Sequence, residues 1–125
     1  MKLQKRVRVV FADDSDIHHF YLGSLLPAFH GIDLLYAAKN GQELLTFLED
    51  QEGRPDVGIV DLHMPILDGI MTAEKLMKRY PEIRIYGFTS SSDSREKATM
   101  LAAGIYKIYA KNELKQLLTE INPSF

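Results

Sequence analysis

Five short apolar segments alternate with five segments of helical periodicity, and this alternation restricts the fold more than any other feature. The apolar segments are rich in β-branched and aromatic residues, which predicts strands. In the intervening segments apolar residues recur every three or four positions, which predicts amphipathic helices. The predicted strands cover residues 7–12, 32–38, 56–62, 84–89 and 104–110, and the helical periodicity covers 17–25, 44–48, 70–77, 98–102 and 114–121.

Strands that are separated by helices form a parallel sheet, because parallel neighbours require a crossover connection, and that crossover is right-handed. We therefore expect an α/β fold, a three-layer sandwich in which helices cover both faces of the sheet. Asn40 and Gly41 open the second predicted helix. Residues that favour N-cap positions mark the expected starts of the last three, namely Asp68, Ser94 and Asn112.

The length and composition fit one domain over residues 1–125, since 46% hydrophobic residues suffice for a packed core. The formal net charge of −2 gives no electrostatic reason for direct binding to nucleic acid or to an anionic membrane. Cysteine is absent, which excludes disulfides, thiolate metal sites and thiol catalysis. The first apolar run is too short for a signal peptide, and none approaches the ~20 residues of a membrane helix, so we expect a cytoplasmic protein.

Polar residues follow the predicted strands where each strand ends. Asp13 and Asp14 come directly after the first strand, Asp61 ends the third, Thr89 ends the fourth, and Lys111 follows the fifth. Ligands of open parallel sheets bind beyond the carboxyl ends of the strands. The sequence therefore predicts that these five residues gather at one edge of the sheet.

Three carboxylates at one edge repel one another. At about 5 Å and an effective dielectric near 20, each pair costs roughly 3 kcal/mol, and three pairs together rival the whole stability of a small domain. Either protonation or a bound cation must neutralise them. Oxygen ligands without His or Cys at metal spacing favour a hard cation, and a site with few carboxylates favours Mg²⁺, which also bridges to phosphate.

Thr89 and Lys111 supply what a phosphoryl group beside these acids would need. With Mg²⁺ on one phosphoryl oxygen, Lys111 and the Thr89 hydroxyl would bind the other two, and such positioning is most of phosphoryl-transfer catalysis. Asp61 is then the candidate nucleophile, a carboxylate that forms an acyl phosphate.

These residues resemble the receiver domain of two-component response regulators, including the single-domain chemotaxis type. The resemblance covers essentially the whole chain, and its most specific motif is D-x-x-M-P-x-x-D-G from Asp61 to Gly69. The resemblance implies a flavodoxin-like fold with strand order 2-1-3-4-5 and five helices. It also implies that Asp61 accepts a phosphoryl group from a phosphohistidine on a sensor histidine kinase or phosphotransfer protein.

The resemblance further implies a role for each neighbour. Asp14, Asp61 and the backbone carbonyl of His63 would bind Mg²⁺, and Asp13 would help through water. Thr89 would move to hydrogen-bond the phosphate, and Lys111 would pair with it. Output would pass through the fourth helix, fifth strand and fifth helix to a downstream effector protein or a fused output domain. The domain would catalyse its own phosphorylation and slow dephosphorylation without being an enzyme for a separate substrate.

The chain departs from the family pattern near the lysine. Ile108 stands where the family often has the Tyr or Phe of its aromatic switch, and Asn112 stands where a proline after a cis peptide bond is common. His63 and Ser91 occupy positions that tune the lifetime of the phosphate in this family. His18 and His19 have no second ligand at metal spacing, so we predict surface or partly packed side chains.

Two other functions remain open from the residues alone. Asp14 and Asp16 form the D-x-D of a haloacid-dehalogenase-type phosphatase, in which Asp14 would carry the phosphate. That alternative leaves Asp61 and its motif unexplained. A phosphorylation-independent interaction module on the same fold is the second alternative, and Ile108 favours it because the usual conformational relay would be missing.

Overall fold

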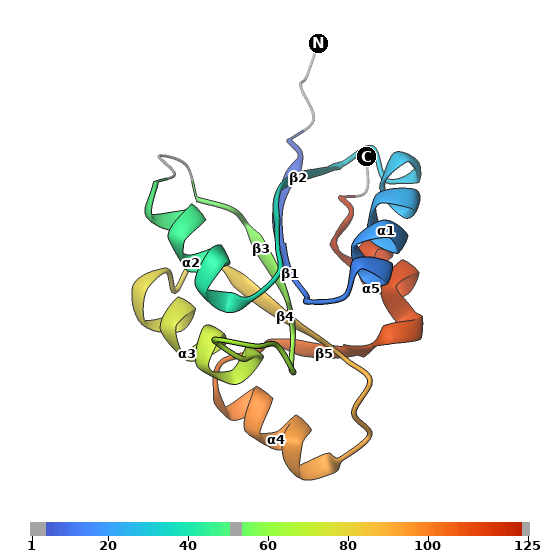
Figure 1. Cartoon of the computed structure of the whole chain (residues 1–125). Coiled ribbons are helices and arrows are strands. Elements are labelled where there is room, and N and C mark those ends of the chain that lie inside the picture. The colour runs from blue at the N-terminus through green and yellow to red at the C-terminus, as the bar shows by residue number, and fades with distance from the viewer. Residues whose placement is uncertain (1–4, 51–53, 124–125) are drawn as a thin grey trace.

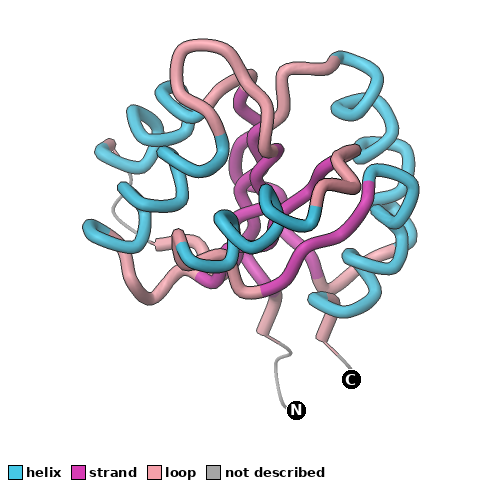
Figure 2. Tube along the Cα trace, turned by 90° about the horizontal axis from the view of Figure 1, so that it is seen from below, coloured by secondary structure: helices cyan, strands magenta, loops and turns pink. Residues whose placement is uncertain are grey.

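The computed structural model describes residues 5–50 and 54–123. It confirms a five-stranded parallel sheet in the order β2-β1-β3-β4-β5, with helices on both faces. Figure 2 shows the strands running between the two helical layers. The strands are β1 (Val7–Ala12), β2 (Ile32–Ala38), β3 (Val57–Asp61), β4 (Arg84–Thr89) and β5 (Lys107–Ala110). The α-helices are α1 (Asp16–Leu25), α2 (Gly41–Glu49), α3 (Gly69–Arg79), α4 (Ser94–Ala102) and α5 (Leu114–Ile121), and short 3-10 turns cover Leu26–Ala28 and Lys111–Glu113.

Two apolar cores hold the layers together, one on each face of the sheet. Helices α2, α3 and α4 cover one face, and α1 and α5 cover the other (Figure 1). Alternate residues of β1 divide between the cores: Val10 belongs to the first, and Val9 and Phe11 belong to the second. Burial on both faces explains why the central strands are continuous apolar runs.

The fifth strand begins three residues later than the sequence pattern predicts. Gly104 adopts a φ of 106°, a left-handed conformation that suits glycine, and it turns the chain after α4. The amide of Ile105 then donates to the Met100 carbonyl at 3.2 Å, and the amide of Tyr106 donates to the Ile85 carbonyl at 2.7 Å. Residues 104–106 therefore close the helix and lead into the strand.

Two predicted helix starts are confirmed and two are wrong. The side chains of Asn40 and Asp68 each accept a hydrogen bond from a backbone amide in the first turn of α2 and α3, respectively. Asp93 rather than Ser94 caps α4, because its carboxylate reaches the Arg95 amide at 2.8 Å. Asn112 lies inside the 3-10 turn that precedes α5, so it caps no helix.

Glu120 of α5 connects the last helix to the edge of the sheet. Its carboxylate accepts hydrogen bonds from the Lys107 ammonium at 2.7 Å, from the Tyr86 hydroxyl at 3.1 Å and from the Tyr109 hydroxyl. The Lys107 ammonium and the two hydroxyls hold the pKa of Glu120 below its usual range. This network joins β4, β5 and α5.

We predict that Glu120→Gln lowers the free energy of unfolding by about 1 kcal/mol at pH 7, since the carboxylate is partly exposed and its interactions are screened. The pKa of Glu120 is lower in the folded state than its ordinary value of 4.5, so its contribution is present above that pH and fades as pH falls. Urea unfolding at pH 7 and pH 3 checks this, with the exposed Glu74→Gln as control. An equal difference between wild type and Glu120→Gln at both pH values would contradict it.

Candidate functional site

The three aspartates predicted to cluster lie together at the carboxyl edge of the sheet. Asp13 follows β1, Asp61 ends β3, and Asp14 completes the group. Each offers a carboxylate oxygen, and these oxygens all lie within 4.8 Å of one another. Asp13 and Asp61 are buried, with 0% and 6% exposure, whereas Asp14 is exposed. These oxygens could bind a divalent cation that reaches the cluster from the side of Asp14.

Burial and crowding both act on the charge of Asp61. Removal from water raises the pKa of Asp61, the Lys111 ammonium lowers it, and the neighbouring Asp13 and Asp14 raise it; the net shift is upward. At 4.8 Å a pair of carboxylates repels by about 3 kcal/mol at an effective dielectric of 20. The ionised form of Asp61 is therefore costly even with the Lys111 ammonium beside it.

Lys111 compensates part of this charge. Its ammonium contacts Asp13 Oδ2 and lies 3.2 Å from Asp61 Oδ1, and it also lies 4.5 Å from the centre of the Phe88 ring. Among the described residues, Asp14 forms no ion pair. One ammonium therefore faces three carboxylates and cannot neutralise all of them.

The β3–α3 loop brings α3 close to the end of β3. Asp68 caps α3, and the Gly69 amide donates to the Leu62 carbonyl at 2.9 Å. A Cβ atom on Gly69 would lie 2.2 Å from the Asp61 carbonyl oxygen, so only glycine fits there. Ile66 takes a φ of 69° in the same loop, although it is not a glycine. Asp68 and Gly69 thus shape the main chain beside Asp61.

Thr89 is buried at the end of β4 and begins a polar chain that reaches α4. Its hydroxyl accepts a hydrogen bond from the Ser91 amide at 3.0 Å. The Ser91 hydroxyl donates to Glu96 Oε1 at 2.5 Å, and Glu96 Oε2 lies 3.3 Å from His63 Nε2. The His63 side chain is exposed and points to Glu96. These contacts join the ends of β3 and β4 to the first turn of α4.

Two histidines of α1 contact Asp13, and the sequence reasoning missed these contacts. Both are partly buried, as predicted. His18 Nδ1 lies 3.0 Å from Asp13 Oδ2 and 3.0 Å from Lys111 Nζ. His19 Nε2 donates to the main-chain carbonyl of Asp13 at 2.6 Å. Their position in the first turn of the helix that follows Asp13 was the available signal.

The two departures near the lysine have structural counterparts. Ile108 is half-buried and packs against the core under α2, α3 and α4. The peptide bond between Lys111 and Asn112 is trans, as are all the described peptide bonds. Nothing at residue 108 provides an aromatic side chain that could turn inward.

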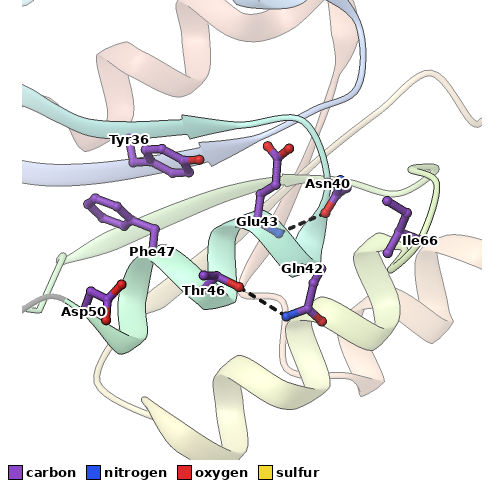
Figure 3. A pocket seen from close by; sticks show the side chains of 8 residues that line it. All are labelled: Tyr36, Asn40, Gln42, Glu43, Thr46, Phe47, Asp50 and Ile66. Carbon is purple, nitrogen blue, oxygen red and sulfur yellow. Dashed lines mark hydrogen bonds between the residues drawn. The ribbon is translucent and has the colours of Figure 1, made fainter.

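A hollow of about 370 Å³ lies beside α2 (Figure 3). The rings of Tyr36 and Phe47 stack there with centroids 4.4 Å apart. The hollow is lined by Tyr36, Asn40, Gln42, Glu43, Thr46, Phe47, Asp50 and Ile66, and none of the five predicted site residues is among them.

Comparison with known sequences identifies the family. Residues 9–122 match the sequence model of the response regulator receiver domain. The chain belongs to this family. The transcriptional regulatory protein LnrK of Bacillus subtilis is 30% identical over 98 residues, which cover 78% of this chain and 44% of LnrK. A protein-glutamate methylesterase/protein-glutamine glutaminase of Clostridium acetobutylicum is 31% identical over 111 residues, which cover 87% of this chain and 32% of that protein.

Solved receiver structures share the fold. The isolated REC domain of RcsB from Salmonella enterica serovar Typhimurium superposes with a TM-score of 0.81 at 22% identity, covering 93% of this chain and 85% of that one. The response regulator domain of Thermotoga maritima CheB gives 0.78 at 20% identity, covering 97% and 99%. This receiver domain spans less than half the length of the two curated relatives. No helix in the described parts of the chain is long and apolar enough to span a membrane.

Proposed function

We propose that this receiver domain takes a phosphoryl group onto Asp61 from the phosphohistidine of a sensor histidine kinase or phosphotransfer protein. The observation that carries the proposal is the position of Asp61, buried between two further carboxylates and the Lys111 ammonium. An Asp61 oxygen forms the new P–O bond as the donor P–N bond breaks, and the bonding electron pair stays with the imidazole of the donor.

The donor set suits Mg²⁺. All three candidate side chains offer oxygen, and exposed Asp14 can bind an ion that keeps several waters. We assign Asp14, Asp61 and the backbone carbonyl of His63 as its ligands, with Asp13 acting through water. The bound ion would neutralise charge on the carboxylates and on the transferred phosphoryl oxygens. Lys111 would bind a second phosphoryl oxygen, and the Thr89 hydroxyl a third.

Asp61 is a better nucleophile candidate than Asp14. Lys111 lies 3.2 Å from Asp61 and forms no ion pair with Asp14 in the described part of the chain. A phosphatase of the haloacid-dehalogenase type would use exposed Asp14, and it would leave the D-x-x-M-P-x-x-D-G motif without a role. Membership of the receiver family also favours Asp61.

We further propose that the domain catalyses its own phosphorylation and slow dephosphorylation. It would act in the cytoplasm without binding nucleic acid or membrane directly.

We infer that output passes through α4, β5 and α5 to an effector protein or a fused output domain. The Thr89 hydroxyl accepts a hydrogen bond from the Ser91 amide, and the Ser91 hydroxyl donates to Glu96 of α4. A shift of Thr89 toward the phosphate would therefore act on α4 through these hydrogen bonds. Such a polar path needs no aromatic side chain at residue 108. The lack of an aromatic residue at position 108 is therefore compatible with phosphorylation-dependent output.

We predict Mg²⁺-dependent uptake of one phosphoryl group from acetyl phosphate, lost in Asp61→Asn because the amide is no nucleophile. Intact-mass spectrometry with and without Mg²⁺ measures it. The control is Asp33→Asn, which removes an aspartate of β2 that pairs with Arg6. A labile phosphate found on another residue of Asp61→Asn would refute the assignment of Asp61.

A second prediction concerns α4. Phosphorylation should change amide exchange in α4 and β5 of the wild type. Glu96→Ala should take up phosphate but show a smaller change in α4, because its link to Ser91 is lost. Lys97→Ala, an exposed neighbour, should respond like the wild type. An unresponsive wild type would favour the phosphorylation-independent module, and a fully responsive Glu96→Ala would refute the path through Glu96.

A further inference from the structure

The two histidines of α1 hold Asp13 at two different points. His19 donates to its main-chain carbonyl, and the His19 ring packs edge-on against Phe11 with centroids 5.1 Å apart. His18 instead meets the carboxylate, with Nδ1 at 3.1 Å from Oδ1 and 3.0 Å from Oδ2. The His18 ring rests against Phe88, whose other contacts include the Lys111 ammonium. His18 is thus packed into the phosphoacceptor site itself.

The Lys111 ammonium has three N–H donors and three partners. These partners are Asp13 Oδ2, Asp61 Oδ1 at 3.2 Å and His18 Nδ1 at 3.0 Å. The side chain of Lys111 is 14% exposed, so water contributes little to holding it. His18 is the one partner among these three that is not a carboxylate.

One ring nitrogen cannot serve both sides of the Asp13–Lys111 ion pair at once. Nδ1 donates to Asp13 in one tautomer and accepts from Lys111 in the other. A divalent cation that recruits Asp13 leaves Lys111 as the remaining partner of Nδ1. Imidazole is a poor ligand for Mg²⁺, and it does not neutralise an ammonium, so Lys111 would keep its full charge for the phosphoryl group.

We propose that His18 is a positioning residue for phosphoryl acceptance. It keeps the Lys111 ammonium beside Asp61 when Asp13 interacts with the bound cation. This proposal rests on the proposed function, since it concerns uptake at Asp61. His18 touches neither the phosphoryl donor nor the transferred group, and it acts through Lys111.

The test compares His18→Leu with His18→Asn. Leucine fills similar space without a polar atom, whereas the asparagine side chain can offer its oxygen near the position of Nδ1. At saturating Mg²⁺, His18→Leu should take up phosphate from acetyl phosphate about tenfold more slowly, as expected for one lost hydrogen bond to a charged group. His18→Asn should recover most of the rate, and the Mg²⁺ concentration for half-maximal rate should stay within about twofold in both.

The Lys111→Ala background separates positioning from a general structural effect. If His18 acts through Lys111, adding His18→Leu to Lys111→Ala should not slow uptake further. An equal slowing in both backgrounds, or a wild-type rate in His18→Leu, would overturn the proposal. The proposal would also be overturned if His18→Leu and His18→Asn both lost thermal stability and His18→Asn did not recover the uptake rate.

A second readout does not depend on phosphorylation. At saturating Mg²⁺, the Lys111 ammonium should give a slowly exchanging proton signal by ¹H–¹⁵N NMR in the wild type and in His18→Asn, and exchange should be faster in His18→Leu. Unchanged exchange in His18→Leu would refute the contact. A wild type that holds the signal but takes up no phosphate would refute the proposed function, and with it the role of His18 in uptake.

Discussion

The pairing of Lys111 with two buried carboxylates is the interaction on which the site depends. Asp13 directly follows β1 and Asp61 ends the neighbouring β3, in a sheet buried on both faces, where their charges cannot be hydrated fully. Without the ammonium beside them, desolvation and mutual repulsion would favour protonation of Asp61. Lys111 lowers this cost but leaves the cluster negatively charged. A cluster with that residual charge is suited to bind a divalent cation. In the proposed function the bound cation then helps to bind the phosphoryl group.

The fold places these groups through ordinary features of a parallel sheet. Asp61 pairs in register with Phe88, and Thr89 with Ala110, so the residues that follow β4 and β5 meet the end of β3 at one edge. Gly69 lets the start of α3 approach the Asp61 main chain. Beyond this edge, a polar path runs from Thr89 through Ser91 to Glu96 of α4. The proposed site and the proposed output surface are therefore physically connected.

The sequence predicted the edge cluster because it depends only on strand order and on where each apolar run ends. Asp13, Asp14, Asp61, Thr89 and Lys111 needed no side-chain conformations to be brought together. His18 and Glu96 were not predicted as neighbours of the site, because their contacts depend on rotamers and on how α1 and α4 lie against the sheet. The start of β5 and the cap of α4 were misplaced for a similar reason: a turn at Gly104 and the reach of the Asp93 carboxylate decide them locally.

The most direct measurement is the free energy of unfolding of wild type and Asp61→Asn at pH 7, without metal and with saturating Mg²⁺. The folded-state pKa of Asp61 is raised above its ordinary value of 3.8, so its charge destabilises the fold above that pH. We predict that Asp61→Asn is the more stable protein without metal. At about 100 times the dissociation constant, Mg²⁺ should stabilise the wild type by about 2.7 kcal/mol, and Asp61→Asn much less. A less stable Asp61→Asn with an unchanged response to Mg²⁺ would contradict the account.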